Sequence, residues 1–362
     1  MIENPFSPKD PVNPKYFVNR DEILTNFHRS INASVRRINS DNIAILGQSG
    51  IGKTSILRKF GDCVINNRDI KAFIAQVELT PLSCRSRKNF LEKIWDDMEK
   101  NSISELSLFG EIRKELSEWR RSALKFGDSL RELWFNILEP RGIDIALLML
   151  DDIHYLLKGY GEEFSELGSV FRELVMDGCN YMLFITGPSN LFSALKEFHE
   201  FTKLFDRYIL NPFNLSETRE AILLPIERSG LRLKVEEDVI EKIYQLTLGH
   251  PYFIHFIMRD ILTLMDKGKL TMKFFNKNWP KIFNHLERER FSDELSSVSP
   301  MERKILIQMA GLPDKVSPSK IGASGKWTLL RRLEERNLII RPERGKYKLY
   351  HPLFRKYLRG IK

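Results

Sequence analysis

The segment between an apolar run and a helical pattern near residue 50 carries the strongest chemical signal in the chain. Gly47, Gly52, Lys53 and Thr54 match the spacing GxxxxGK[ST]. Glycines let the backbone turn tightly, so that successive N–H groups face phosphate oxygens, and the helix that follows adds its positive end. A lysine here reaches the β- and γ-phosphates, and a threonine hydroxyl takes one magnesium position. The segment predicts binding of ATP or ADP with Mg²⁺, and the predicted contacts are Gly47, Gln48, Ser49, Gly50, Ile51, Gly52, Lys53, Thr54 and Ser55.

A second signal, which consists of acidic residues, follows about 100 residues later. The apolar run 146–150 ends in Asp151 and Asp152. We predict that Asp151 holds the magnesium through water, and that Asp152 orients or deprotonates the attacking water. Lys53 and the magnesium would neutralise the charge of the phosphoryl group in transfer. Any buried strand that ends in a polar loop gives the same letters, so the prediction depends on the phosphate loop upstream.

Short apolar runs and helical patterns alternate through the first 200 residues, which predicts a parallel sheet with helices on both faces. The predicted strands are 42–46, 72–79, 145–150, 181–185 and 208–210, and residues 87–139 are predicted to be helical. After Pro212 four helices are expected, over 216–228, 236–246, 251–265 and 271–289. A polar link over 291–299 then precedes a third unit. The predicted domains are a nucleotide-binding domain with an N-terminal arm (1–212), a helical domain (213–295) and a C-terminal domain (296–362).

Composition and charge bound the function. The 362 residues are 42% hydrophobic and 29% charged, as in an ordinary globular protein. We see no secretory signal and no apolar run long enough for a membrane helix, and three scattered cysteines fit a reducing cytoplasm. Residues 301–362 hold 16 Lys and Arg against 5 Asp and Glu, whereas the rest of the chain is close to neutral. A basic end on a neutral body favours a partner with negative charge, most often nucleic acid. A solvated basic surface is the alternative.

The C-terminal pattern predicts a winged helix, with helices over 300–310, 317–321 and 325–337, a hairpin around 342–346 and a closing helix. On the third helix, Trp327, Leu330 and Leu333 are predicted to lie on one face. Duplex DNA is the predicted partner, and its predicted contacts are Lys326, Arg331, Arg332, Arg344, Lys346 and Lys348. Glu334 and Glu335 on the same helix leave docking of a protein partner as the alternative.

The pair GQSGIGKTS and LLMLDDIH resembles the AAA+ and STAND ATPases, and is most similar to archaeal ATPases related to origin-recognition initiators. This resemblance runs from about Phe17 to the end of the chain. It implies an α/β P-loop NTPase fold with a parallel sheet, a helical lid domain and a C-terminal winged helix. Phe17, Val18 and Arg20 match the family segment that lies along the adenine. A plain helix N-terminus would look the same.

Further segments match the family. Residues 184–189 resemble the sensor-1 strand end, with Thr186 or Ser189 as the polar residue. Arg207 matches the arginine finger, although a salt bridge at a helix end explains it equally well. Residues 249–252 resemble the GxP motif of a lid helix, where Pro251 packs against the nucleotide, and Arg259 would then be sensor 2.

Together these signals predict an ATP-hydrolysing molecular switch that is slow until a partner or a neighbouring copy completes its site. ATP would close the lid and change the contact of the winged helix with DNA. A small-molecule kinase is the second candidate, because such enzymes use the same loop. A scaffold that holds nucleotide without turnover is the third.

Overall fold

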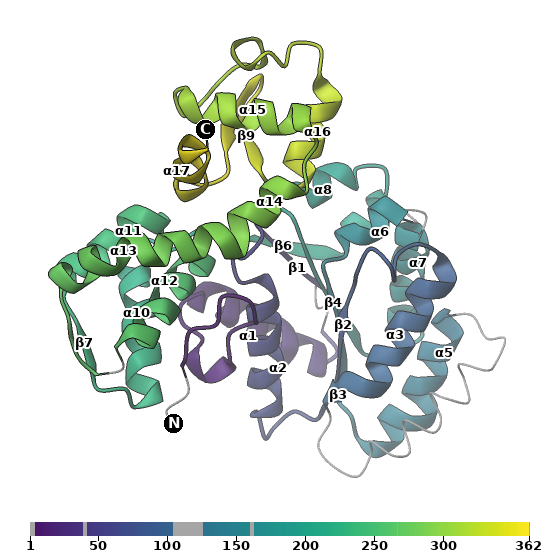
Figure 1. Cartoon of the computed structure of the whole chain (residues 1–362). Helices are drawn as coiled ribbons and strands as arrows, with labels where there is room; N and C mark the ends of the chain where they lie inside the picture. The colour runs from purple at the N-terminus through teal and green to yellow at the C-terminus, as the bar shows by residue number, and fades with distance from the viewer. Residues whose placement is uncertain (1–3, 39–41, 104–125, 160–162, 266, 362) are drawn as a thin grey trace. The chain divides into compact units, whose positions relative to one another are not determined.

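The chain folds into two compact units. The computed structural model (Figure 1) describes residues 4–38, 42–103, 126–159, 163–265 and 267–361. The first unit is Arg20–Asn211, and the second joins the residues up to Asn19 with Pro212–Lys362. The arm predicted as part of the nucleotide-binding domain therefore packs with the second unit. Within the described residues, every helix falls short of the length and apolar character needed to cross a membrane.

A parallel sheet of five strands forms the centre of the first unit, in the order β2-β4-β5-β1-β6. Its strands are β1 (Asn42–Leu46), β2 (Ala72–Glu78), β4 (Ile145–Asp151), β5 (Tyr181–Gly187) and β6 (Phe205–Ile209). The short β3 (Ser102–Ile103) pairs antiparallel with β2 at the edge. Because β5 lies between β1 and β4, the carboxyl ends of these three strands meet at one edge of the sheet. The predicted α/β class is confirmed.

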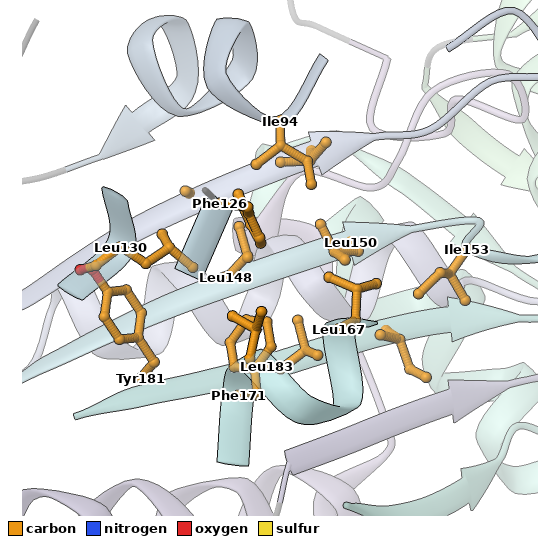
Figure 2. Close-up of a cluster of buried hydrophobic side chains, with 14 of the residues drawn as sticks. Ile94, Phe126, Leu130, Leu148, Leu150, Ile153, Leu167, Phe171, Tyr181 and Leu183 are labelled. Atoms are coloured by element: carbon orange, nitrogen blue, oxygen red, sulfur yellow. The ribbon is translucent and has the colours of Figure 1, made fainter. Parts of the chain in front are cut away.

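Helices cover both faces of the sheet, because β4 and β5 are apolar on both sides and fully buried. On one face lie α1 (Asp21–Val35) and α2 (Lys53–Ile65), whose Phe27 and Phe60 stack with ring centroids 4.1 Å apart beside Phe184 of β5. On the other face, α3 (Arg87–Asn101), α5 (Phe126–Leu133) and α7 (Glu163–Met176) pack against Leu148, Leu150 and Leu183 (Figure 2).

The stretch predicted as one helix over 87–139 is divided in the structure. After α3 the chain enters β3, and residues 104–125 lie outside the described part of the chain. From α5 the chain continues helically through η2 (Trp134–Leu138) and η3 (Glu139–Arg141) to Gly142. The helical prediction is therefore wrong at β3. Three short helices complete the unit: α6 (His154–Gly159), α8 (Leu191–Ala194) and α9 (His199–Thr202).

The four helices predicted after Pro212 are present, each starting at or next to the predicted residue. They are α10 (Leu215–Ser229), α11 (Glu237–Thr247), α12 (Pro251–Leu264) and α13 (Met272–Leu286). Asn214 and Glu217 form a capping box at the start of α10, which fixes its first residue. A parallel strand pair, β7 (Leu233–Val235) and β8 (Gly268–Leu270), joins the loops between helices.

The C-terminal elements follow in the predicted order of helix, short helix, helix and hairpin. They are α15 (Pro300–Gly311), η5 (Pro318–Ile321), α16 (Trp327–Glu335), β9 (Ile339–Glu343), β10 (Lys346–Leu349) and the closing α17 (Pro352–Gly360). The hairpin turn is shorter than predicted, because β9 extends to Glu343 and only Arg344 and Gly345 separate the strands.

The predicted polar link over 291–299 is wrong, because most of it is helical and apolar on one side. η4 (Glu287–Phe291) and α14 (Ser292–Ser296) continue directly from α13. Phe291 and Leu295, one helical turn apart, are both buried. They belong to one apolar core that contains Phe253 of α12 as well as Phe354 of α17. The helices of 213–295 and the C-terminal elements are therefore joined by a common core.

The N-terminal arm is anchored along the helices of the second unit. Asn4 donates a hydrogen bond to the carbonyl of Arg259 at 3.3 Å, and Phe6 is buried edge-on against His255. The 3-10 turn η1 (Pro14–Tyr16) follows, and Arg228 donates to the carbonyl of Phe17 at 2.9 Å. These contacts explain why the arm groups with residues made more than 200 positions later.

Candidate functional site

The phosphate loop turns at glycines where another residue would be strained. Gly50 and Gly52 have φ of 76° and 100°, in the left-handed region. A Cβ on Gly47 would lie 2.7 Å from the side chain of Ile51 and 3.2 Å from the carbonyl oxygen of Leu210. The glycine spacing is therefore required by the turn itself as well as by the close approach of a ligand.

Helix α2 starts at Lys53 with no side-chain cap, since its N-cap is Gly52. The positive end of its backbone dipole is consequently directed at the loop, which suits a phosphate. Gln48 and Ser49 lie on the outer part of the loop, whereas Ser55 is buried in the first turn of the helix.

The amino group of Lys53 bends back over the loop. It donates to the carbonyl oxygens of Gly47 at 3.3 Å and Gln48 at 3.2 Å. Burial lowers the pKa of Lys53, while the carboxylates of Asp152 and Asp151 act in the opposite direction. The structure thus brings the predicted lysine and both predicted acids within electrostatic reach of one another.

Three strand and helix ends meet at Asp151. The hydroxyl of Thr54, on α2, donates to Oδ2 of Asp151 at 2.6 Å, and the hydroxyl of Thr186, on β5, donates to Oδ1. Thr186 is fully buried and also accepts a hydrogen bond from the backbone N–H of Asp152 at 2.8 Å. One hydroxyl therefore fixes the positions of both acids. Ser189, the other sensor-1 candidate, is exposed beyond the strand end.

The oxygen atoms of Thr54 and Asp151 fit a magnesium ion. Hydroxyl and carboxylate oxygens are the hard ligands that Mg²⁺ prefers, and this ion keeps several waters when proteins bind it. The 2.6 Å separation shows that both oxygens approach the same point at the end of the phosphate loop.

Asp152 has the environment of a general base. Its φ of 56° places it in the left-handed region at the end of β4. Its pKa is raised to about 6, first by burial, against the effect of Lys53, and further by the negative charges of Asp151 and Glu78. Nδ1 of His154 lies 3.6 Å from Oδ1 of the same carboxyl. A carboxyl that titrates near neutral pH is well matched to removing a proton from water.

Glu78 and His154 were not predicted as site residues. Glu78 ends β2 and is the register partner of Asp151 on β4. The carboxyl ends of adjacent parallel strands meet at one edge, so the acid that is the second-last residue of the 72–79 run was a usable signal. His154 follows the two acids at the start of α6 and was visible in the LLMLDDIH segment.

Arg207 is not directed at the phosphate loop of its own chain. It pairs with Ala44 in the middle of β1, whereas the loop begins after Leu46. Its guanidinium stacks on Phe192 at 4.0 Å and donates to the carbonyl of Thr202 at 3.2 Å. The alternative to the arginine-finger role was a salt bridge at a helix end. Within the described residues, Arg207 makes this cation–π contact in place of a salt bridge.

The residues predicted to line the base divide between the units. Phe17, Val18 and Pro251 belong to the second unit, and Arg20 belongs to the first, where it donates to the carbonyl of Asn211 at 2.7 Å. Asn19 and Arg20 have φ of 63° and 70°, so two consecutive residues without glycine's freedom are left-handed where the chain passes between units. The nucleotide role of these four residues stays a prediction.

Comparisons with known proteins fit this geometry. No family model matches the sequence, and no curated protein matches it. A Walker-type ATPase of Pyrococcus abyssi is similar in structure over 95% of this chain and 99% of its own, with 18% identity and a TM-score of 0.64. The ORC2 protein of Aeropyrum pernix, solved as ADPNP-ADP complexes, covers 94% and 93%, with 15% identity and a TM-score of 0.63. The ORC1 protein of the same organism, in complex with DNA, covers 94% and 92%, with 14% identity and a TM-score of 0.52.

These likenesses show that the chain has the fold of the solved P-loop ATPases. Within this fold, Thr186 is the second-last residue of β5, the strand that separates the phosphate loop from Asp151, and its two hydrogen bonds tie that strand to both acids. The similarity to these structures is a similarity of fold. The roles proposed for individual residues rest on the contacts that they make within this chain.

The C-terminal elements of the second unit carry exposed basic side chains. Lys326, Arg331 and Arg332 are exposed on or beside α16, and Arg344 and Lys346 are exposed on the hairpin, with Lys348 half-buried. Nε of Arg331 pairs with Glu335 at 2.9 Å. Trp327, which was predicted to lie on one face with Leu330 and Leu333, is 57% exposed, while both leucines are buried.

A buried aromatic cluster joins α12 to the C-terminal elements, and we call it the aromatic seam: Tyr252, Phe253, Arg290, Tyr350 and His351. The guanidinium of Arg290 lies 3.9 Å from the ring centre of Tyr252 and 5.1 Å from that of Phe253. Rings of Phe253 and His351 approach to 4.0 Å between centroids. None of these residues was predicted as part of a site.

Polar contacts close the aromatic seam. Arg290 pairs with Glu294 at 2.8 Å, and the hydroxyl of Tyr350 donates to the same carboxylate at 2.8 Å. His351 donates from Nε2 to the carbonyl of Thr247, at the end of α11, and accepts the N–H of Leu353 at Nδ1. These two bonds require the neutral ring, and burial lowers its pKa to about 4.

The predicted GxP motif lies at the edge of the aromatic seam. A Cβ on Gly249 would lie 1.7 Å from the carbonyl oxygen of Phe213, and the N–H of Phe213 donates to the carbonyl of Gly249 at 2.9 Å. Pro251 is the first residue of α12, and His250 packs against Phe253 and His351. Position 249 therefore requires glycine, because the backbone of Phe213 passes too close for any side chain. Arg259, the sensor-2 candidate, is bound by Asp260 and Glu289 and stacks on Phe256.

Proposed function

We propose that this chain is an ATPase that acts as a molecular switch, binding ATP with Mg²⁺ at the phosphate loop and hydrolysing it slowly until a partner completes the site. The hydrogen-bond chain from Thr54 through Asp151 and Thr186 to Asp152 carries this proposal. It supports the proposal because it links the proposed magnesium ligands, Thr54 and Asp151, to the proposed base, Asp152, at the end of a glycine-rich loop. The AAA+ fold supports the same interpretation.

Each residue has a role in this mechanism. The loop backbone and Lys53 bind the phosphates, and Thr54 with Asp151 holds Mg²⁺, which supplies positive charge to the phosphate oxygens. Asp152 accepts a proton from the attacking water, for which its raised pKa is suited. Thr186 positions both acids and, being fully buried, keeps them in place as the γ-phosphate leaves.

Arg207 is proposed to act on a neighbouring copy. In its own chain the side chain is held by Phe192 and Thr202 at the exposed edge strand β6. An arginine finger stabilises charge on the transferring phosphoryl group, and one supplied by a neighbour would make hydrolysis depend on assembly.

Residues 213–295 are proposed to form the lid and residues 296–362 a winged helix that binds duplex DNA. The net charge of the last 62 residues and the exposure of the basic side chains on α16 and the hairpin support DNA. Six phosphate contacts would make the affinity fall with salt at a log–log slope of about −5. The lid and the winged helix share one apolar core, so ATP binding would move them as one body.

The test is the rate of ATP hydrolysis with and without duplex DNA, at two salt concentrations, with Lys53→Ala as the inactive control. Stimulation by DNA that fades with salt is the expected result. Hydrolysis in the wild type equal to that of Lys53→Ala would overturn the ATPase.

Protein docking is the second candidate for the C-terminal elements. The pair of Arg331 and Glu335 leaves a mixed-charge strip on α16, which suits an acidic and basic protein surface as well as a phosphate backbone. Hydrolysis that ignores DNA at both salt concentrations would favour this candidate.

A further inference from the structure

Trp327 is exposed in a way that the fold does not require. It is the first residue of α16 and exposes 57% of its surface, although Leu330 and Leu333 on the same helix are buried. Within the described residues its indole pairs with no other aromatic ring. A large apolar ring left in water forgoes the stabilisation that burial would give, so its exposure indicates a contact to something outside this chain.

A second exposed apolar side chain, Met301, contacts the residue that precedes Trp327. Met301 lies in the first turn of α15 and is 45% exposed, and Nζ of Lys326 lies 3.9 Å from its sulfur. Lys326 directly precedes Trp327 and also donates to the carbonyl of Gly322 at 2.9 Å. The start of α16 thus carries an exposed ring and an ammonium group, and that ammonium group contacts an exposed apolar side chain at the start of α15.

The charged side chains of α15 and α16 indicate the class of partner. Arg331, one helical turn after Trp327, and Arg332 are exposed on α16, and Arg303 and Lys304 are exposed on α15. The only acid on the exposed side of α16 is Glu335, which is paired with Arg331. An exposed aromatic ring on elements that carry exposed cations is the combination that binds a nucleic-acid strand, with bases on the ring and phosphates on the cations.

We infer that Trp327 stacks on an unpaired base, so that the C-terminal elements bind DNA with exposed bases, at a fork or in a single strand, more tightly than closed duplex. In closed duplex the faces of the bases are covered by their neighbours and only their edges face the grooves. An indole gains its full contact area only from a base face. This inference rests on the proposed DNA binding and names the form of DNA that the site takes.

The test is fluorescence anisotropy with labelled oligonucleotides of equal length, as closed duplex, fork and single strand, across a salt series. The proteins are the full wild-type chain, Trp327→Ala, Trp327→Phe and Arg332→Ala. Trp327→Ala should lose about 5- to 150-fold affinity for fork and single strand, with little loss for duplex and an unchanged salt slope. Trp327→Phe should keep most of the affinity, because it retains a flat ring.

Arg332→Ala is the matched control on the same helix. It should weaken all three DNAs and reduce the salt slope by about 1, as the loss of a phosphate contact does. Circular dichroism of each variant checks that the fold is kept.

The outcomes separate the two proposals. Equal losses on duplex and fork for Trp327→Ala, or no loss on either, would overturn the stacking inference and leave DNA binding intact. A wild type that binds none of the three DNAs would overturn both.

Discussion

The strand ends around Asp151 and the aromatic seam both bury charged groups, and they satisfy them in opposite ways. At the strand ends, short hydroxyl side chains hold the carboxylates, and Lys53 is bound only by carbonyl oxygens at 3.2 and 3.3 Å. In the seam, Arg290 is enclosed by three rings and a carboxylate, and is 13% exposed. The first arrangement keeps capacity for a ligand, whereas the second leaves none. A buried charged group therefore indicates a binding site only where a ligand can replace its present partners.

That contrast predicts where each region is sensitive. Changes in the aromatic seam should alter stability, because they leave buried groups without partners. Changes at the strand ends should alter turnover, because the groups there are proposed to act on ATP.

The largest effect is expected for Arg290→Ala. This change removes the cation and leaves Glu294, which is 22% exposed, with only the hydroxyl of Tyr350. Breaking such a partly buried pair should lower the free energy of unfolding of the second unit by roughly 3 kcal/mol. Urea unfolding followed by circular dichroism measures it, with Arg288→Ala, two residues away and exposed, as the control. A shift no larger than that of the control would show that the seam does not hold the unit together.

Acid should destabilise the second unit through its buried histidines. Burial lowers the pKa of His351 and of His255 from 6.5 to about 4. Below pH 6.5 the unfolded chain takes up protons that the folded chain refuses, so stability falls from about pH 6.5 down to about pH 4. Each histidine contributes up to about 3 kcal/mol to this loss.

His351→Gln should remove its share of that pH dependence, since glutamine can donate to Thr247 without titrating. Urea unfolding at a series of pH values gives the slope. A slope identical to that of the wild type would contradict the assignment of a neutral His351.

At the strand ends, Thr186→Val should lower kcat for ATP hydrolysis by about 100-fold, because the two acids lose the hydroxyl that positions them. The affinity for ATP, measured by equilibrium titration, should change little. Thr186→Ser keeps the hydroxyl and is the matched control, with activity near that of the wild type. A Thr186→Val protein that hydrolyses ATP normally would show that Asp151 and Asp152 need no such support.

The smallest effect is expected from Glu78. In the wild type, kcat/KM should fall as the pH drops through about 6, because Asp152 becomes protonated. Glu78→Gln removes a negative charge that raises this pKa, so the midpoint should move down by less than about one pH unit. Asp69→Asn, before the opposite end of β2, is the control. A midpoint that moves up would contradict the role given to Glu78.

The phosphate loop and Asp151 were predictable because their signals are local. A glycine spacing and an apolar run that ends in an acid are each contained within ten residues. The part played by Thr186 was not, since it depends on β5 lying between β1 and β4. Strand order is set by packing across the whole sheet and leaves no mark on the nearby letters.

Two features that the sequence did not reveal have simple physical causes. Trp327 shares a helical face with Leu330 and Leu333, but α16 begins at Trp327, so no preceding turn of helix covers the ring. The segment 291–299 contains mostly polar letters, yet Phe291 and Leu295 are four residues apart and face the same side of a helix. The mostly polar composition of this segment therefore concealed the two apolar residues.

The position of the N-terminal arm has a consequence for the order in which the protein can be made. Lys9 pairs with Glu289, about 280 residues later in the chain. A ribosome that adds 5–20 residues per second needs roughly 15 to 60 seconds to bridge that gap. The first unit can fold in the meantime, while Phe6 stays exposed to water because the helices that bury it have not yet been synthesised. The arm is synthesised well before the helices that it packs against, so it is among the last segments to fold, and a chaperone that meets the nascent chain would find it exposed.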